Sequence, residues 1–276
     1  MLRRSVPLCT VLTAAGLLAC SDSPTDSGPR VALTPAAADV QVGRTVSLSA
    51  SVFELTDSTV TWASDCGDLQ ANGRSAIFTA PWAPQSCTAT VTSVENPTLS
   101  ATAELTVVPV PAADNLLAPA GFDTDASPFE MYVTQPPRVE WAPEDARGST
   151  TSGSMRMTHA FGGNGGIMIA LEYCFTPEAG AEYRAGGNFR FENANPQTTV
   201  IVAADVYSDG CENRMDFLGQ LSLDGDSTDW TPDTFTFTAP EGSTRPIRIS
   251  VGIWKQAGNN VDTSALVDDL FLMLID

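Results

Sequence analysis

The residues that could carry acid–base or nucleophilic chemistry are few in this chain of 276 residues. It contains one histidine, His159, and one lysine, Lys255, against 33 aspartates and glutamates. A zinc site with two or three histidines therefore lacks ligands, and a Ser-His-Asp triad has His159 alone to build on. The formal charge of −19 repels phosphate backbones and the 14 basic residues are scattered, so nucleic-acid binding is excluded. We expect backbone groups at a strand end to satisfy His159.

Carboxylates are numerous enough to form pairs, and two of their uses remain open. A glycosidase needs two carboxyl groups about 5 to 9 Å apart in a cleft, and sequence spacing singles out no such pair. The segment 224–229, Asp-Gly-Asp-Ser-Thr-Asp, resembles an Asp-rich calcium loop without its distal glutamate, and a solvated turn is the alternative interpretation.

Aromatic and charged side chains alternate with apolar ones in two segments. Ile247, Ile249, Val251 and Ile253 fall on one face of a strand, which leaves Arg248 and Trp254 on the opposite face. Asp205 and Tyr207 share a face of the segment 198–207 in the same way. Because an aromatic ring can cover the apolar face of a sugar while charged groups bind its hydroxyls, we predict a ligand site made of the following residues: Trp254, Arg248, Tyr207, Asp205 and Trp141. Alternatively, these aromatic residues cap the sandwich or lie singly on the surface.

The segments that position these residues alternate apolar and polar side chains, as antiparallel strands do. Turn residues separate five of them in the first part of the chain: 45–52, 59–62, 76–79, 88–92 and 101–108. Seven more follow: 155–160, 166–175, 182–192, 198–207, 233–239, 245–254 and 265–275. No helical periodicity interrupts them, so the sequence predicts an all-β protein.

The first 20 residues have the charge and hydropathy order of an export signal. Two arginines precede a mostly apolar run, 6–19, that is too short to span a bilayer of about 30 Å. The segment resembles a bacterial lipoprotein signal peptide, and Leu17-Leu18-Ala19-Cys20 resembles its lipobox. The resemblance implies cleavage before Cys20, lipidation of Cys20 and membrane attachment through the lipid alone. In such lipoproteins, aspartate after the lipidated cysteine would imply retention in the inner membrane. This chain has Ser21 there, so the resemblance implies a location in the outer membrane or at the cell surface.

Composition divides the remaining chain into two domains. Residues 21–30 contain no large apolar side chain and are predicted to be a flexible linker. Residues 109–113, rich in proline and alanine, form a second linker. The predicted domains are 31–108 and 114–276.

The first domain carries Val60-Thr61-Trp62, the Asn72-Gly73 turn, the approach to Pro81, and Thr88-Ala89-Thr90-Val91, in that order. This order resembles a bacterial immunoglobulin-like domain and implies a β-sandwich with Trp62 in its core. The departure from antibody domains is that Cys66 and Cys87 both follow the tryptophan.

The second domain resembles the galactose-binding-like jelly roll of carbohydrate-binding modules. The residues that carry the likeness are Asn115-Leu116-Leu117, Gly121-Phe122-Asp123, Val139-Glu140-Trp141, the segment 152–157, the segment 234–240, and Val267-Asp268-Asp269-Leu270. The resemblance implies a larger sandwich and a polysaccharide or glycan partner. It also implies a structural calcium ion held by Asp123 and Asp269, although the group usually has glutamate at the position of Asp123.

Four cysteines remain once Cys9 has left with the signal peptide and Cys20 is lipidated, and four cysteines allow three pairings. Pairing within each predicted domain joins Cys66 to Cys87 and Cys174 to Cys211. Disulfides suit the oxidising compartment that an export signal implies.

We therefore predict a lipid-anchored, non-catalytic envelope protein that displays a glycan-binding jelly roll on an immunoglobulin-like spacer. A structural or adhesin-like lipoprotein that binds another protein is the first alternative, and a carboxylate-dependent, glycoside-active enzyme is the second. Convergent aromatic side chains on an outer sheet face would favour glycan binding.

Overall fold

The computed structural model describes residues 28–117, 122, 139–160, 165–242 and 244–275. In these residues the chain forms strands and a single short 3₁₀ helix. The strands make four sheets around two separate hydrophobic cores. The protein is therefore an all-β sandwich protein, as the alternating pattern predicts. No helix in the described part of the chain has the length and apolar character needed to span a membrane.

The N-terminal sandwich packs the sheet β1-β3-β6-β5 against the sheet β2-β8-β7-β4. Its strands are β1 (Arg30–Thr34), β2 (Ala37–Gln41), β3 (Thr45–Phe53), β4 (Val60–Ser64), β5 (Asp68–Asn72), β6 (Ser75–Thr79), β7 (Gln85–Ser93) and β8 (Ser100–Val108). Alternate residues such as Leu48, Phe78, Val91 and Leu105 are buried between the sheets, because successive side chains of a strand point to opposite faces.

Trp62 lies partly buried against this core, and its indole N–H donates a hydrogen bond to the carbonyl oxygen of Gly73 at 2.9 Å. Cys66 is bonded to Cys87, so the disulfide ties the end of the β4–β5 connection to β7. The Trp62 indole therefore holds the turn between β5 and β6, and the disulfide holds the chain just before β5.

The C-terminal sandwich packs the sheet β15-β12-β17-β10-β9 against the sheet β11-β16-β13-β14. Its elements are β9 (Val139–Ala142), β10 (Ser154–His159), β11 (Gly166–Phe175), β12 (Glu182–Phe191), β13 (Thr198–Tyr207), η1 (Asp209–Cys211), β14 (Arg214–Asp224), β15 (Thr231–Thr238), β16 (Ile247–Lys255) and β17 (Thr263–Leu274). Ile247, Ile249, Val251 and Ile253 all face the core between these sheets, as their spacing predicts.

Five strands are absent from the sequence-based prediction: β1, β2, β5, β9 and β14. Four of them, all except β14, are only four or five residues long, so they offer too few residues for a clear alternation. The omission of β14 has another cause. It is an edge strand with Leu221 as its single fully buried side chain, so it lacks the apolar stripe of a central strand.

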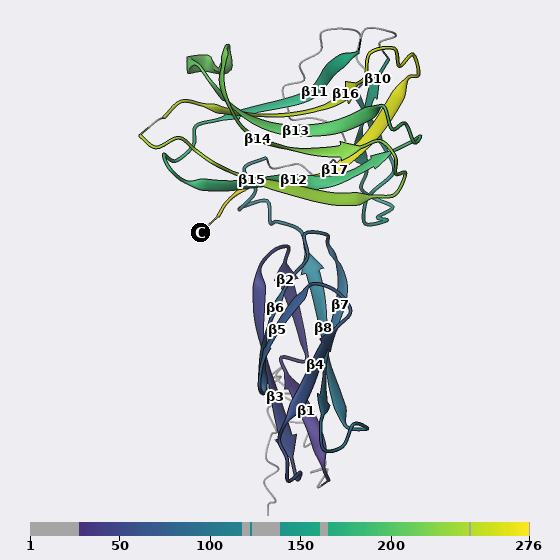
Figure 1. Cartoon of the computed structure of the whole chain (residues 1–276), viewed down its shortest axis with the longest axis vertical. Coiled ribbons are helices and arrows are strands. Elements are labelled where there is room, and N and C mark those ends of the chain that lie inside the picture. Colours follow the sequence, from purple (N-terminus) through teal and green to yellow (C-terminus); the bar gives the residue numbers. More distant parts are fainter. Residues whose placement is uncertain (1–27, 118–121, 123–138, 161–164, 243, 276) are drawn as a thin grey trace, which may run out of the picture.

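The two sandwiches meet at the outer face of the sheet that contains β12 and β17 (Figure 1). Trp82, in the β6–β7 connection, stacks on Phe271 of β17 with ring centroids 5.7 Å apart. The guanidinium of Arg184 in β12 also lies over the Trp82 ring, 4.2 Å from its centroid. The connector is held as well, because the backbone N–H of Leu116 donates to the carbonyl of Leu272 at 2.8 Å. The second sheet, β11-β16-β13-β14, lies on the side away from the N-terminal sandwich (Figure 1).

Candidate functional site

The face of the β11-β16-β13-β14 sheet that points away from the core carries four of the five predicted ligand residues. On β16, Arg248 and Trp254 alternate with the buried isoleucines and so lie on this outer face. Strand β13 pairs in register with β16, with Asp205 opposite Arg248 and Thr199 opposite Trp254. Residues directly opposite each other point to the same side. We call this surface the distal face.

One end of the distal face is apolar and open. Trp254 is 38% exposed, and its register partner on β11, Ile167, is 51% exposed. Ile169 and Ile201, which lie opposite each other across Gly252, form the next row and are half-buried. The ring of Trp254 thus stands in a small apolar platform that solvent reaches, which is what stacking against the apolar face of a ligand requires.

The middle of the distal face carries small side chains. Ser250 lies opposite Ala203 on one side and Glu172 on the other. A bulge between Ile169 and Leu171 shifts β11 by one residue and turns Glu172 to the outer face. Sequence alternation alone could not place Glu172 on this face, because a bulge changes which residues share a side.

At the opposite end a charged cluster is packed together. Arg248 contacts the carboxylate of Glu172, and its guanidinium lies 3.7 Å from the centroid of the Tyr207 ring. Arg214 of β14 holds the carboxylate of Asp205 at 2.7 Å. Sequence reasoning placed Arg248, Tyr207 and Asp205 together and missed Glu172 and Arg214, whose positions depend on strand register.

Burial changes the acidity of this cluster. Desolvation raises the pKa of Asp205 above its ordinary value, against the opposing effect of Arg214 and Arg248. Desolvation likewise raises the pKa of the Tyr207 hydroxyl. Both side chains are buried, with 6% of Asp205 and 8% of Tyr207 exposed. Asp205, Tyr207 and Arg248 are therefore shielded from solvent, whereas Arg214 at the border of the cluster and Trp254 at the other end of the face are exposed.

Trp141 does not join the other predicted residues. It lies on the edge strand β9 of the other sheet, where its indole N–H donates to the carbonyl oxygen of Phe122 at 2.8 Å. Two more aromatic residues of this domain could contact a ligand by their side-chain type, Tyr132 and Tyr173. Tyr132 lies outside the described residues, and Tyr173 stacks with Phe175 at 6.3 Å between centroids.

The predicted calcium site is described in part, because Asp123 lies outside the described residues. Asp269 is the partner of Arg147 at 3.2 Å and accepts a hydrogen bond from the amide of Asn188. The neighbouring Asp268 is fully buried. Burial and the nearby carboxylates of Asp269 and Asp145 raise the pKa of Asp268 to about 7.

One carboxylate oxygen of Asp145, a neighbour of Asp268, is buried and lacks a hydrogen-bond partner within the described residues: Asp145 Oδ2. Buried carboxylate oxygens without a proton donor suit a cation such as calcium, which takes only oxygen ligands. Among the described residues, no three carboxylates in this region bring oxygens within 4.8 Å of one another, and Asp269 is engaged by Arg147, so a calcium site here stays a prediction.

The second acidic segment is a turn between β14 and β15. Asp224 accepts a hydrogen bond from Thr199 at 3.2 Å, and the backbone N–H of Asp229 donates to Ser227. The carbonyl of Gly225 accepts from Asn195. Asp224, Asp226 and Asp229 are all exposed, which fits a solvated turn.

Elsewhere in the described residues, three potential metal-binding side chains converge only at Asp65, Cys66 and Cys87. The two sulfur atoms there form a disulfide. This group is therefore not a metal centre.

His159 and Lys255 are both buried and lie close together. The ammonium of Lys255 is 3.5 Å from the backbone carbonyl of His159, and His159 Nε2 faces the carbonyl of Gly166 at 3.3 Å. Desolvation lowers the pKa of both groups. The expected backbone partner of His159 is thus present, at the end of β10.

The two cysteine pairs are those expected: Cys66 with Cys87 and Cys174 with Cys211. Disulfides are typical of proteins exported to an oxidising compartment. Cys211 also reaches the charged cluster, because its carbonyl oxygen accepts a hydrogen bond from Arg248.

Comparisons with solved structures give carbohydrate-binding modules among the similar chains. One, described as a "Family 16 Carbohydrate Binding Module-2", has 20% identity and a TM-score of 0.40, and the match covers 58% of this chain and 99% of that chain. A carbohydrate-binding module of the β-sandwich superfamily has 14% identity and a TM-score of 0.43, over 91% and 100% of the chains. The CBM22-1 xylan-binding domain of Xyn10C from Paenibacillus barcinonensis has 10% identity and a TM-score of 0.39, over 57% and 92%. No protein-family model and no curated protein matches the chain.

Proposed function

We propose that this protein is a non-catalytic glycan-binding protein of the cell envelope, and that it binds its ligand on the distal face at Trp254. The observation that carries the proposal is the exposed indole of Trp254 beside Ile167 on a regular, open sheet. An aromatic ring on a rigid strand needs no rearrangement to stack on a sugar, so little conformational entropy is lost on binding.

The small side chains of the middle rows support a ligand that lies flat on the sheet. Ser250 and Ala203 separate the Trp254 end from the charged cluster, and on the β13 side Trp254 is bordered by Thr199, which donates a hydrogen bond to the exposed Asp224. Hydroxyl groups of a ligand stacked on Trp254 can reach Thr199 and backbone groups near Gly252. This arrangement matches a ligand with one apolar face and a polar rim, as sugars have.

A catalytic role has less support from the same geometry. Glu172 and Asp205 are each engaged by an arginine, and the exposed Asp224, opposite Thr199 on the same face, accepts a hydrogen bond from Thr199. A glycosidase needs one carboxyl group to hold a proton near neutral pH and another free to attack or to activate water. The arginine contacts occupy the carboxylates of Glu172 and Asp205, so neither is free to attack a sugar or to activate water.

Display at a surface is consistent with where the chain enters the molecule. Strand β3 runs from Thr45 to Phe53, and Arg30, at the start of β1, pairs with Phe53 at its far end. The other end of β3 is close to the junction, because Gly43, two residues before Thr45, lies against Trp82. The chain therefore enters at the end of the N-terminal sandwich remote from the distal face. A lipid on Cys20, with the structural calcium ion as a second proposed component, completes the proposed envelope protein.

The test is binding of the full chain to an array of glycans, followed by titration calorimetry with Trp254→Ala on the best ligand. Trp254 makes its contacts on the surface, so its loss leaves no core cavity, and we expect a melting temperature within a few degrees of the parent. Affinity should fall by about tenfold or more, as for the loss of a central aromatic anchor.

Phe53→Ala is the matched control, because Phe53 is 37% exposed but lies on the N-terminal sandwich, and its affinity should not change. Unchanged affinity in Trp254→Ala with a loss in Trp141→Ala would move the site to the other sheet. Binding of proteins and of no glycan would replace this function with the adhesin-like one.

A further inference from the structure

The loop that joins β13 to β14 is closed on itself and is fixed to a distant strand. In this segment, Ser208–Asn213, the backbone N–H of Ser208 donates to the carbonyl of Asn213 at 2.9 Å, and the N–H of Cys211 donates back to Ser208 at 3.0 Å. The side chain of Cys211 is bonded to Cys174 of β11. We call residues 208–213 the strap.

The strap crosses the distal face. Strand β16 lies between β11 and β13 in the sheet, and Arg248 of β16 is the register partner of Cys174 on one side and of Asp205 on the other. A bond from Cys174 to the loop after β13 must therefore pass over β16 at Arg248. In Figure 1 the turn after β13 rises on the side of its sheet that is remote from β12 and β15.

The strap is what separates the buried end of the distal face from its open end. Arg248 donates a hydrogen bond to the carbonyl of Cys211, and 13% of its side chain is exposed. Trp254, six residues along the same strand and on the same face, is 38% exposed. The ring of Tyr207 and the carboxylate of Glu172 also cover Arg248, so the strap accounts for the difference together with these side chains.

The backbone of the strap is held in an unfavourable conformation. Cys211 has φ of 58°, the left-handed region that L-residues with a side chain rarely occupy. Such a residue persists only where its surroundings fix it, and the bond to Cys174 and the hydrogen bond from Arg248 are the contacts that do so. Loss of the bond should therefore release the segment.

The two disulfides differ in access. Cys87 is 1% exposed within the N-terminal core, whereas Cys174 is exposed and lines an open hollow together with Gly210, Cys211 and Thr244. Thiol–disulfide exchange requires a thiolate to reach one sulfur atom along the bond axis, so access strongly affects its rate. Reductants should therefore act on Cys174–Cys211 first.

We propose that the Cys174–Cys211 disulfide is a reducible lock on the strap, and that its reduction uncovers the charged cluster of Arg248, Asp205 and Tyr207. The co-reactant is a dithiol. Its thiolate attacks one sulfur atom, the S–S bond breaks through a mixed disulfide, and the second thiol of the reagent closes to its own disulfide. Two electrons pass to the protein, and the two cysteines leave the exchange as thiols with protons from the dithiol.

This inference concerns the state of the distal face and does not depend on what the face binds. In the reduced protein, we expect solvent to reach Arg248, Glu172 and Asp205 at the end of the distal face opposite Trp254, where Arg214 is already exposed. A ligand that is neutral and apolar on one face can then meet hydrogen-bonding groups that the oxidised protein withholds.

The test is graded reduction of the full chain with dithiothreitol, followed by alkylation of free thiols and mass spectrometry. We expect Cys174 and Cys211 to be alkylated at a roughly tenfold lower reductant concentration than Cys66 and Cys87, in line with their access. Hydrogen exchange measured on the same samples should show faster exchange in residues 205–214, with the strands of the N-terminal sandwich unchanged.

A double variant, Cys174→Ser with Cys211→Ser, should show the fast exchange in this region without reductant and no further change with it. Its matched control is Cys66→Ser with Cys87→Ser, in which exchange of the strap should stay slow. If a variant does not fold, the exchange data on the mildly reduced parent decide the question. Alkylation of both pairs at one concentration, or unchanged exchange of residues 205–214 once Cys174 and Cys211 are alkylated, overturns the proposal.

Discussion

At the scale of single residues, Asp268 is a fully buried carboxyl group whose acidity is strongly perturbed. Its pKa of about 7 results from burial and from the neighbouring Asp269 and Asp145. A folded-state pKa above the unfolded one means that the folded protein holds the proton more tightly. The contribution of Asp268 to stability is therefore full only below its ordinary pKa of 3.8, falls as the pH rises from there, and is lost once the pH has passed about 7.

Calcium should reverse that loss, because a cation takes the place of the proton among the carboxylates. We expect calcium to raise the melting temperature by several degrees at pH 8 and by little at pH 5.5, where protons compete for Asp268. Thermal unfolding with calcium and with a chelator measures this. Asp268→Asn should remove the calcium effect and Asp226→Asn, in the exposed turn, should keep it. An equal effect of calcium in Asp268→Asn would place the ion elsewhere.

The lipidation of Cys20 is predicted from the sequence alone, because residues 1–27 lie outside the described residues. Cys20→Ala should abolish acylation and release the protein from the membrane fraction, since no acyl chain then enters the bilayer. Mass spectrometry of the mature N-terminus checks it. A parent protein whose N-terminus is unmodified, or begins at a residue other than Cys20, contradicts the lipoprotein interpretation.

At the scale of elements, alternation predicted the central strands and not the edges. Strands such as β16 bury one face fully, so their apolar residues recur at every second position and reveal both the core and the outer face. The prediction that Trp254 faces outward therefore followed from Ile247 to Ile253 alone. Edge strands such as β14 bury little, and their sequence resembles that of a loop.

The candidate site was predictable only as far as alternation reaches. Which residues face outward on β13 and β16 follows from each strand by itself, so Asp205, Tyr207 and Arg248 were found. Which residues lie beside them depends on register and on the bulge in β11, and neither leaves a local signal. For the same reason Trp141 was grouped with residues that lie on a different sheet.

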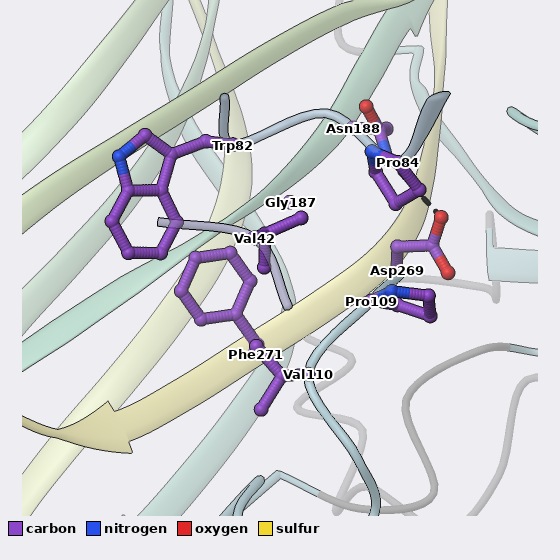
Figure 2. A pocket seen from close by; sticks show the side chains of 9 residues that line it. All are labelled: Val42, Trp82, Pro84, Pro109, Val110, Gly187, Asn188, Asp269 and Phe271. Carbon is purple, nitrogen blue, oxygen red and sulfur yellow. Dashed lines mark hydrogen bonds between the residues drawn. The ribbon is translucent and has the colours of Figure 1, made fainter. Parts of the chain in front are cut away.

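At the scale of the whole molecule, the junction is an ordered contact instead of a free hinge. Figure 2 shows Trp82 beside Phe271, with Val42, Pro84 and Pro109 around the same small pocket. Gly43 lies so close under the Trp82 ring that an added Cβ would come within 2.1 Å of it. The half-buried indole thus lies between backbone of the N-terminal sandwich and side chains of the C-terminal one, and it joins the two.

The last prediction concerns the contact of Trp82 with Phe271 and Arg184. Trp82→Ala removes the stacking with Phe271 and the contact with Arg184, which together contribute about 1 to 3 kcal/mol beyond area burial. That energy couples the sandwiches, because Trp82 belongs to one and its partners to the other. Calorimetric unfolding should therefore change from one transition to two, and small-angle scattering should show a larger radius of gyration.

Trp230→Ala is the matched control for this coupling. Trp230 also meets an arginine, Arg190 at 5.8 Å, but both residues belong to the C-terminal sandwich. Its loss should lower the stability of that sandwich and leave the number of transitions and the scattering profile unchanged. If Trp82→Ala unfolds in one transition with the parent's radius of gyration, then the short connector at 109–116, with its hydrogen bonds to β17, suffices to fix the orientation, and the aromatic contact is not what couples the two sandwiches.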